Sequence, residues 1–502
     1  MIELPELEYP GNSPWKHQGT AIEKGVRKMI ESGGYALLME MGTGKTFTSI
    51  TIMRHLFKHE KRLLRTMVFC PPVVRENWRR EILQNSKIPA NRVHVLDGPG
   101  SKRLGYFVQK TIIEPSLPIK APESHIFITN YESLSMKDLF DKIKKWGPEL
   151  IIWDESHKLK NHRSKRAKLA TKLADLAGYK LLLTGTPILN TPMDIWSQFR
   201  VMDGGLTFDA NFIAFRSRYF VDKNAGMPKQ KYFPNWQPLP GLADQFNELI
   251  YQSAFRALKK DCLDLPPMVR KTLEVEMVPE QEKMYEEMEE HFIAYLDQKA
   301  CVASIALTKA LRMQQIVTGF FVDDEGEVTI FEKNPRLQAL KEVLEEVAHN
   351  HKVIVWASFK ENYKMISKVC DDLGLGYRML TGGMSDKQRN EAIDQFNEDP
   401  SARVMISNQQ CGGVGVNLTA ASYSVYYSKN FSLEADLQSE ARNHRGGSEV
   451  HESITRIDLI CPGTIDQTVT QALHNKESVA NAILRIEDEP VSFSNDSSDL
   501  HA

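Results

Sequence analysis

The chain has 502 residues, which is more than a single hydrophobic core sustains, so we expect two or three domains. Hydrophobic residues make up 42% of it and charged residues 25%, which is ordinary for a soluble globular protein. The formal net charge of −2 excludes a uniformly basic surface, although positive charge can still gather along one groove.

The cysteines and the apolar runs indicate in which cellular compartment the protein is expected. No two cysteines form a CxxC pair, which argues against structural zinc and for a reducing compartment. No run of about eighteen apolar residues occurs, and residues 1–10 are acidic rather than a basic leader. We expect a cytoplasmic protein without a membrane segment, nuclear only if its source is eukaryotic. The six cysteines are Cys70, Cys262, Cys301, Cys370, Cys411 and Cys461.

A glycine-rich segment at residues 39–46 lies between two patterned stretches. The apolar run 35–39 predicts a strand, and residues 47–57 carry apolar side chains at helical spacing. At a junction of strand, loop and helix, backbone N–H groups and the positive helix end face one point, which suits a polyphosphate. The alternative is an accidental Gly-Lys-Thr sequence in an ordinary loop, which the flanking strand and helix disfavour.

The residue types in this loop suit a nucleotide bound with Mg²⁺. Gly42 and Gly44 permit close approach of the backbone, Lys45 would reach the β and γ phosphates, and Thr46 would offer its hydroxyl to Mg²⁺. We therefore expect ATP and Mg²⁺ as cofactors. The expected nucleotide-binding residues of the loop are Met41, Gly42, Thr43, Gly44, Lys45 and Thr46.

Two adjacent acids follow a second apolar run. Residues 150–153 are apolar, and Asp154 and Glu155 come directly after them. Because a carboxylate at the end of a buried strand can hold a metal, Asp154 is the Mg²⁺ candidate. Glu155 is expected to position and deprotonate the attacking water. The alternative is a solvated turn, but the order and spacing of loop and acids match a parallel nucleotide-binding sheet.

The second half of the chain repeats this architecture without a phosphate loop. Arg442 and Arg445 are three residues apart, so they would share one helix face and reach the γ-phosphate together across a cleft. The alternative is a solvated helix face. A second parallel α/β lobe is predicted from short β-rich runs at 352–357, 377–380, 402–407, 423–427 and 454–460.

The sequence resembles helicase superfamily 2, and within it the Swi/Snf-type ATPases, from about residue 14 to about residue 477. Arg256, Lys259, Lys260 and residues 265–267 resemble the basic helix and Leu-Pro segment that this branch places between its lobes. The matching segments are 14–18 (Q motif), 39–46 (motif I), 68–81 (Ia), 128–132 (Ib), 154–157 (II), 183–190 (III), 412–419 (V) and 438–447 (VI). Departures that suggest a divergent bacterial or viral member are Met39, Ser156, residues 430–432 and Ser448.

The resemblance implies further site residues. Gln18 would read the adenine edge, and Gly415 would belong to the nucleotide site. The expected catalytic residues are Lys45, Glu155, Gln438, Arg442 and Arg445. Basic residues beside the motifs are individually more often solvated surface charges, so only their clustering is informative. The residues expected to meet nucleic acid are Arg75, Thr129, Tyr131, Ser358, Lys360, Gly382 and Asn408.

We predict an α/β fold of two tandem RecA-like parallel-sheet lobes with helical Swi/Snf-type insertions between them. The predicted parts are an ATP-binding lobe at 1–205, insertions and interlobe linker at 206–335, a C-terminal lobe at 336–485 and an acidic disordered tail at 486–502.

Two parts of the insertion leave alternatives open. Residues 223–236 interleave basic and aromatic side chains, which can stack on bases, although we favour a loop whose rings cap a helical subdomain. Residues 280–315 predict helices that protrude from the second lobe. The alternative is that their apolar stripe simply faces the core.

These features predict an ATP-dependent DNA helicase or translocase that acts as a monomer on duplex or branched DNA. Its expected output is unwinding or branch migration at forks and junctions. One alternative is a translocase that displaces a DNA-bound protein, such as RNA polymerase, without separating strands. An RNA helicase is disfavoured by residues 256–267, and a structural DNA-binding protein with a dead site is disfavoured by the intact catalytic residues.

Overall fold

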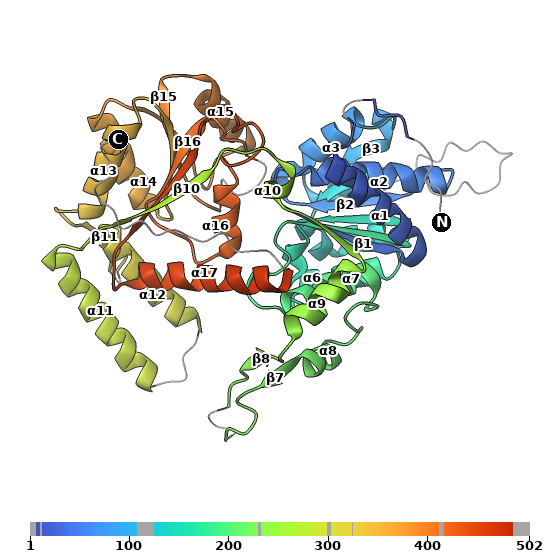
Figure 1. Ribbon diagram of the computed structural model, residues 1–502, viewed down its shortest axis with the longest axis horizontal. Helices are drawn as coiled ribbons and strands as arrows, with labels where there is room; N and C mark the ends of the chain where they lie inside the picture. Colours follow the sequence, from blue (N-terminus) through green and yellow to red (C-terminus); the bar gives the residue numbers. More distant parts are fainter. Residues whose placement is uncertain are drawn as a thin grey trace. The chain divides into compact units, whose positions relative to one another are not determined.

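The computed structural model describes residues 7–10, 13–107, 125–228, 232–298, 303–323, 325–410 and 416–484. The chain divides into two compact units. Among the described residues, the first unit comprises residues 7–263 with 478–484, and the second comprises residues 264–477. Each unit contains one parallel β-sheet covered by helices (Figure 1).

The sheet of the first unit has seven strands in the order β3-β4-β2-β5-β6-β1-β9, and all its pairings are parallel. Its central strands are apolar on both faces because helices cover both sides. The strands are β1 (Gly34–Met39), β2 (Thr66–Cys70), β3 (Val93–Val95), β4 (Ile126–Asn130), β5 (Leu150–Asp154), β6 (Tyr179–Thr184) and β9 (Ala254–Ala257).

Two hydrophobic cores lie on the two faces of this sheet. Along β5, Leu150 and Ile152 belong to one core, whereas Ile151 and Trp153 belong to the other. The first core includes apolar residues of α1 (Lys16–Ser32), α2 (Lys45–His59) and α3 (Arg75–Gln84). The second core includes residues of α5 (Lys137–Trp146), α6 (Lys165–Ala174), α7 (Asp194–Asp203), α8 (Phe212–Tyr219) and α9 (Leu242–Tyr251).

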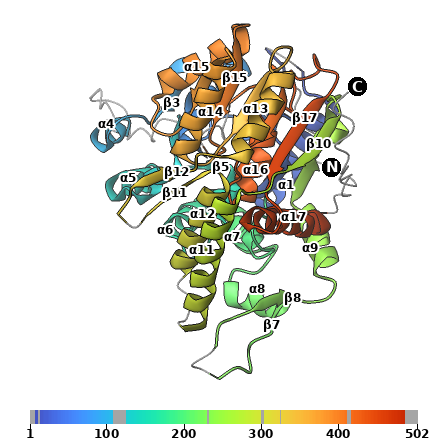
Figure 2. The ribbon, with the colours of Figure 1, turned by 90° about the vertical axis from the view of Figure 1, so that its left-hand side faces the viewer.

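Short elements complete the first unit. Strands β7 (Phe220–Asp222) and β8 (Trp236–Pro238) form an antiparallel pair that projects with α8 away from the main sheet (Figures 1 and 2). The remaining helices are α4 (Gly100–Gly105), α10 (Lys259–Cys262) and the 3₁₀ turns η1 (Pro72–Val74), η2 (Ala90–Arg92), η3 (Tyr131–Ser135) and η4 (Ser156–Leu159).

The sheet of the second unit has six parallel strands in the order β10-β17-β16-β13-β15-β14. Apolar side chains of its central strands alternate between two cores, as Val353 and Ile354 do on β13. The strands are β10 (Met268–Glu274), β13 (Lys352–Trp356), β14 (Gly376–Leu380), β15 (Ala402–Ser407), β16 (Ala421–Tyr426) and β17 (Ile454–Ile460).

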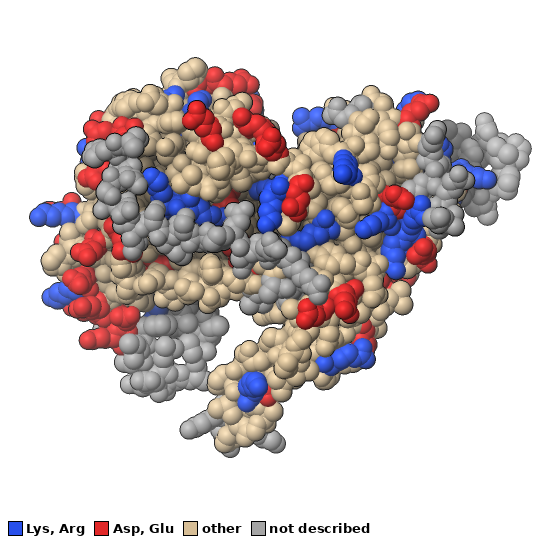
Figure 3. Space-filling model, viewed as in Figure 1, with Lys and Arg blue, Asp and Glu red and all other residues tan. Residues whose placement is uncertain are grey.

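Two long helices, α11 (Pro279–Gln298) and α12 (Ala303–Val317), lie side by side in the second unit (Figure 2). Acidic side chains gather over α11 (Figure 3). Tyr285 of α11 is buried in a small apolar cluster that is separate from the cores of the sheet. The other elements are α13 (Pro335–Val347), α14 (Lys360–Asp372), α15 (Asp386–Glu398), α16 (Leu433–Glu440), α17 (Ile465–Leu484) and the hairpin β11 (Phe320–Val322) and β12 (Val328–Ile330).

The prediction of two parallel α/β lobes with helical insertions is confirmed by these sheets. The structure adds that residues 206–335 are not purely helical, since they give β9 to the first sheet and β10 to the second. Arg256, expected on a basic helix, lies on β9 because this segment extends the sheet beside β1. The predicted tail at 486–502 lies outside the described residues.

Candidate nucleotide site

The glycine-rich loop connects β1 to α2, as the sequence pattern predicts. Gly42 and Gly44 have φ of 87° and 84°, a left-handed conformation that favours glycine. A Cβ atom on Gly44 would lie 2.1 Å from Nε2 of Gln18, so the Gln18 side chain would have to move, and the left-handed φ would strain any larger residue there. The Lys45 ammonium group donates a hydrogen bond to the Met39 carbonyl, with an Nζ···O distance of 2.8 Å.

Gln18 holds this loop from the first helix. Its Oε1 accepts from the Trp15 N–H at 2.9 Å, and its Nε2 donates to the Thr43 carbonyl at 3.3 Å. The Nε2 atom of His17 lies 2.9 Å from the same carbonyl. Because both polar atoms of the Gln18 side chain are engaged within the protein, an adenine base would have to replace these bonds. Adenine recognition by Gln18 stays a prediction.

The acidic pair lies at the same edge of the sheet as the loop. Strands β5, β6 and β1 are consecutive, and Asp154 pairs in register with Leu183, the residue before Thr184. The carboxyl ends of the three strands therefore bring Asp154, Thr184 and the loop to one edge.

Asp154 is buried and held by two hydrogen bonds. The Trp78 indole N–H donates to its Oδ2 at 2.8 Å, and the Glu155 backbone N–H donates to its Oδ1 at 3.0 Å. Burial, and then repulsion from Glu155, raise the pKa of the Asp154 carboxyl, whereas the Trp78 hydrogen bond and the charge of Lys45 act in the opposite direction. A cation bound beside this carboxyl would lower its pKa.

Glu155 is held in an unusual backbone conformation and bonded to a histidine. Its φ is 53°, which costs free energy for a residue other than glycine and is typical of functional sites. One carboxylate oxygen lies 3.3 Å from Nδ1 of His157, and that Nδ1 is 3.2 Å from the Thr184 hydroxyl oxygen. Thr184 Oγ1 also accepts from the Thr186 N–H at 3.1 Å. Glu155 is thus connected through His157 to the end of β6.

Trp78, His157 and Thr184 were not among the predicted site residues. All three lie within segments that resemble family motifs, but their contacts to Asp154 and Glu155 join residues far apart in the sequence. Only the sheet order brings them together. The sequence did contain a signal for two of them, since Trp78 and Thr184 lie in segments that resemble family motifs and so were candidates for the site.

The residues at this edge fit a nucleotide bound with Mg²⁺. Mg²⁺ prefers oxygen ligands and is bound by few protein groups together with substrate phosphates. Asp154 and the half-buried Thr46 would supply such oxygens. No group of three or more His, Cys, Asp or Glu side chains suited to a metal occurs within the described ranges, so a nucleotide would have to complete the coordination.

The second unit contains the two predicted arginines, but not on a helix. Helix α16 ends at Glu440, so Arg442 and Arg445 lie in the turns that follow it, and the prediction of a shared helix face is wrong. The segment turns because Gly446 and Gly447 follow, and Gly447 has φ of 103°. The two side chains nevertheless converge, since Nη1 of Arg442 and of Arg445 lie 3.2 and 3.4 Å from the Val416 carbonyl oxygen.

This environment leaves positive charge poorly compensated. Arg442 is only 2% exposed, and burial lowers the pKa of Arg445. The Nε atom of Arg445 has no hydrogen-bond partner among the described residues. The pKa of Arg445 is lowered by burial alone, so an anion bound beside this guanidinium would stabilise it. Gly415, predicted for the nucleotide site, lies directly before Val416 and outside the described residues.

A buried ionic network fixes α16, which carries Gln438. Arg456 of β17 bonds to the Asp436 carboxylate at 3.0 Å and to Glu440 at 2.8 Å, both on α16. Its guanidinium also lies 3.9 Å from the centre of the Tyr426 ring. Gln438 is buried, and its Nε2 lies 3.4 Å from Glu434 Oε1. The network therefore positions the helix that leads into Arg442 and Arg445.

The predicted nucleic-acid residues of the first unit need a correction. Thr129 is fully buried with its hydroxyl 2.6 Å from Ser133 Oγ, and Tyr131 is 1% exposed and donates to the Asp154 carbonyl at 2.7 Å. Their side chains support the sheet edge and are not accessible to phosphates. The physical reason is that Thr129 lies within β4, which is covered on both faces, and Tyr131 begins the turn η3 directly after that strand. Arg75 is half-buried and paired with Asp97 at 3.1 Å.

The predicted nucleic-acid residues of the second unit do come together. Ser358, Gly382 and Asn408 follow β13, β14 and β15, which are neighbours in the sheet. Asn408 Nδ2 lies 3.4 Å from the Ser358 carbonyl, and Asn408 N–H donates to the Leu380 carbonyl at 3.2 Å. Lys360 is exposed at the first turn of α14. The carboxyl ends of these strands thus form one polar surface.

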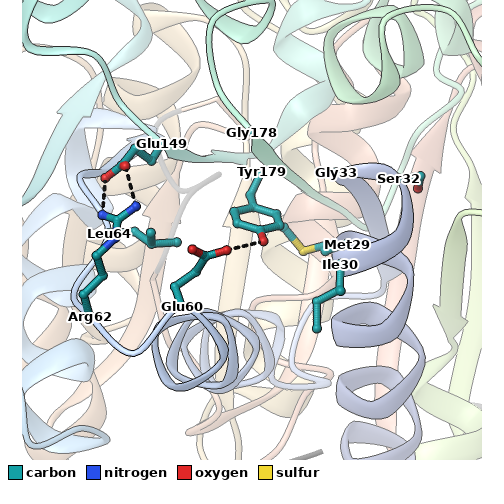
Figure 4. Close-up of a pocket in the computed structure, with 10 residues that line it drawn as sticks. All are labelled: Met29, Ile30, Ser32, Gly33, Glu60, Arg62, Leu64, Glu149, Gly178 and Tyr179. Atoms are coloured by element: carbon teal, nitrogen blue, oxygen red, sulfur yellow. Dashed lines mark hydrogen bonds and ion pairs between the residues drawn. The ribbon is translucent and has the colours of Figure 1, made fainter. Parts of the chain in front are cut away.

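A hollow at the opposite edge of the first sheet is closed by its own polar groups. Arg62 donates to both carboxylate oxygens of Glu149, at 3.0 and 2.8 Å, and Tyr179 donates to Glu60 at 2.7 Å (Figure 4). Because these groups satisfy one another, nothing here calls for a ligand.

No helix in the described ranges is long and apolar enough to cross a membrane.

Comparison with known proteins gives two family matches and several relatives. The SNF2-related domain matches residues 18–320, and the helicase conserved C-terminal domain matches residues 335–447. "Uncharacterized ATP-dependent helicase MG018" of Mycoplasma genitalium is 25% identical over 476 residues, which cover 94% of this chain and 42% of that protein. A Caenorhabditis elegans homologue of "SWI/SNF-related matrix-associated actin-dependent regulator of chromatin subfamily A-like protein 1" is 27% identical, covering 92% of this chain and 61% of the relative.

Among solved structures, the SWI2/SNF2 ATPase core of Sulfolobus solfataricus in complex with dsDNA is similar at 23% identity and a TM-score of 0.44. It covers 96% of this chain and 95% of that one. The chain spans less than two thirds of the length of both relatives named above. Since the SNF2-related match alone extends over more than half of its residues, the chain belongs to the SNF2-related family of ATP-dependent helicases.

Proposed function

We propose that this protein is a DNA-dependent ATPase that moves along DNA and remodels it. The observation that carries the proposal is the sheet edge at which the Gly42–Gly44 loop, Asp154 and Thr184 lie at the ends of three consecutive strands. Such an arrangement fits a nucleoside triphosphate and the water that attacks its γ-phosphate. The family match supports the same chemistry.

Each residue has a role in hydrolysis under this proposal. Lys45, which donates to the Met39 carbonyl here, would neutralise charge on the β and γ phosphates, and Thr46 and Asp154 would hold Mg²⁺, which would neutralise further phosphate charge. Glu155 accepts the proton of the attacking water. His157, 3.3 Å from Glu155, holds that carboxylate in position. Arg442 and Arg445 stabilise the negative charge that develops on the γ-phosphate, an effect worth roughly 10³ to 10⁵ in rate.

DNA is the proposed track. The polar surface formed by Ser358, Gly382, Asn408 and Lys360 offers hydroxyl, amide and ammonium donors, which are the groups that bind phosphates without reading sequence. The Sulfolobus structure is that of a core bound to double-stranded DNA, and the Caenorhabditis relative carries a chromatin-regulator name. We infer that forks or junctions are remodelled, with protein displacement as the competing output.

The nucleotide assignment is tested with Lys45→Ala. ATP turnover should fall at least a hundredfold, because the phosphates lose their cation. Lys58→Ala, an exposed lysine in the last turn of the same helix, is the matched control and should keep wild-type turnover. Equal turnover in Lys45→Ala and the control would overturn the site assignment.

The DNA assignment is tested by ATPase stimulation and by strand separation. Turnover is measured with single-stranded, duplex, forked and four-way-junction DNA and with duplex RNA, alongside unwinding of the same substrates. Strong stimulation by branched DNA with strand separation supports remodelling. Stimulation by plain duplex without separation favours protein displacement. Stimulation by RNA alone would contradict a DNA track.

A further inference from the structure

We propose that the described part of the β7–β8 hairpin is a second DNA contact, at which the exposed rings of Tyr232 and Phe233 stack against unpaired bases. We call residues 220–228 and 232–238 the aromatic hairpin. The inference rests on the proposed function for its ligand, DNA, but it concerns a surface that takes no part in nucleotide hydrolysis.

Exposed apolar side chains concentrate around this hairpin. Fifteen large hydrophobic side chains are exposed among the described residues, and seven of them lie within residues 206–239. Phe233 is 62% exposed and Tyr232 is 45% exposed. The seven are Leu206, Ile213, Val221, Met227, Tyr232, Phe233 and Leu239.

The exposed rings are not the remainder of a poor core. Phe208, Phe215 and Phe246 are buried at 1% exposure or less and pack against one another inside this part of the unit. Trp236 packs against that core and lies under the Arg216 guanidinium, 4.0 Å from the ring centre. The expectation that the rings of this loop cap a helical subdomain therefore holds for Trp236, whereas Phe233 points to solvent.

Hydrogen bonds hold the exposed rings in place. The Asp222 carboxylate accepts from the Tyr232 hydroxyl at 2.5 Å and from the Asn235 N–H at 2.8 Å. Asn224 Nδ2 donates to the Phe233 carbonyl at 3.0 Å. A ring whose backbone and side chain are already ordered loses little entropy on binding, so this loop is pre-organised for a flat partner.

The charge of the described part of the loop indicates the kind of partner. Lys223 is exposed, and its backbone N–H donates to the Asn235 carbonyl at 2.9 Å, so it lies across from the strand that follows the exposed rings. Residues 223–236 contain no acidic residue, and the preceding Asp222 is engaged by Tyr232. A lysine beside exposed aromatic rings is a combination that binds nucleic acid, because the cation attracts phosphates while the rings stack on bases. Bases inside a duplex are already stacked on each other, so the rings require bases that are unpaired, as at a fork.

The test removes the two rings and compares two DNA ligands. The variant Tyr232→Ser/Phe233→Ser is paired with the control Leu206→Ser/Ile213→Ser, which removes two apolar side chains of the same region that are more exposed still. Affinities are measured by fluorescence anisotropy for a fork with single-stranded arms and for a blunt duplex of the same length. Since stacking of one base changes affinity by about fivefold to a hundredfold, the ring variant should bind the fork at least tenfold more weakly.

Three further measurements distinguish a loss of base stacking from a general loss of DNA binding. The ring variant should bind blunt duplex as the wild type does, and keep duplex-stimulated ATP turnover, since no residue of the nucleotide site is changed. Phe233→Trp should keep fork affinity, because the larger ring still stacks. Unchanged fork affinity in the ring variant, or an equal loss on blunt duplex or in the control, would overturn the inference. Failure of the wild type to bind any DNA would instead refute the proposed function.

Discussion

Replacing Trp78 by phenylalanine should weaken metal binding at the nucleotide site. Among the described residues, the Trp78 indole N–H is the only side-chain group that donates a hydrogen bond to Asp154 Oδ2, with an Nε1···Oδ2 distance of 2.8 Å. Both residues are buried. Phenylalanine keeps an aromatic ring but removes the donor. The carboxylate then loses the bond that fixes its orientation, and its pKa rises further because that bond favours the ionised form.

The size of the effect follows from the type of bond removed. A hydrogen bond to a charged group contributes about 1.5 to 3 kcal/mol, which corresponds to roughly tenfold to a hundredfold in an equilibrium constant. Loss of a group that orients a metal ligand typically reduces metal affinity by about the same factor. We therefore expect the Mg²⁺ concentration for half-saturation to rise by roughly tenfold to a hundredfold.

The assay is titration of Mn²⁺ or Mg²⁺ by calorimetry in the presence of a non-hydrolysable ATP analogue. Trp153→Phe is the matched control, since Trp153 is fully buried, stacks on Phe69 and has no hydrogen-bond partner for its Nε1 in the described part of the chain. It loses the same ring volume without losing a bond. If both variants bind the metal equally well, the indole hydrogen bond does not orient Asp154 and the reasoning fails.

Three further predictions concern other parts of the structure. Gly44→Ala should weaken binding of a fluorescent ATP analogue, since the left-handed φ costs a residue with a Cβ atom about 1 to 2 kcal/mol and the methyl group would displace the Gln18 side chain. Arg456→Met should lower the free energy of unfolding of the second unit by about 3 to 5 kcal/mol in denaturant titrations, because it leaves buried carboxylates unpaired. Burial, and then repulsion from Glu440, raise the pKa of Glu477 to about 7. A carboxyl whose pKa is raised in the folded state destabilises the fold once the pH rises through that value. Glu477→Gln should therefore stabilise the protein above pH 7 by on the order of 2 kcal/mol and have no effect near pH 4. Thermal unfolding measured across this pH range checks the prediction.

Local patterns predicted the strands well where apolar runs are bounded by polar turns. The runs at 402–407 and 454–460 coincide with β15 and β17, and the run at 352–357 differs from β13 by one residue. The glycine loop between β1 and α2 was equally accessible, because its conformation is dictated by residues that are neighbours in the chain. These features depend on short-range physics, which a sequence displays directly.

Features that depend on the packing of distant segments were not predictable in the same way. Spacing placed Arg442 and Arg445 on one helix, but spacing does not reveal that α16 ends at Glu440. Motif position placed Thr129 and Tyr131 near the track, yet it carries no information about burial. The bond between Trp78 and Asp154 joins residues 76 positions apart, so it becomes visible only once β2 is known to lie beside β5.

The way the arginines are held supports their proposed role more strongly than their spacing did. Arg442 and Arg445 share one neutral carbonyl, that of Val416, as a hydrogen-bond acceptor. A charge-assisted bond to a phosphate oxygen is roughly twice as strong as a bond to such a carbonyl, so a phosphate would draw either guanidinium away from Val416. By contrast, Arg456 lies between carboxylates that already neutralise it, and no anionic ligand would displace them at comparable cost. The second unit thus contains one buried arginine that carboxylates neutralise, Arg456, whereas the Val416 carbonyl that Arg445 contacts is a neutral acceptor that a phosphate would replace.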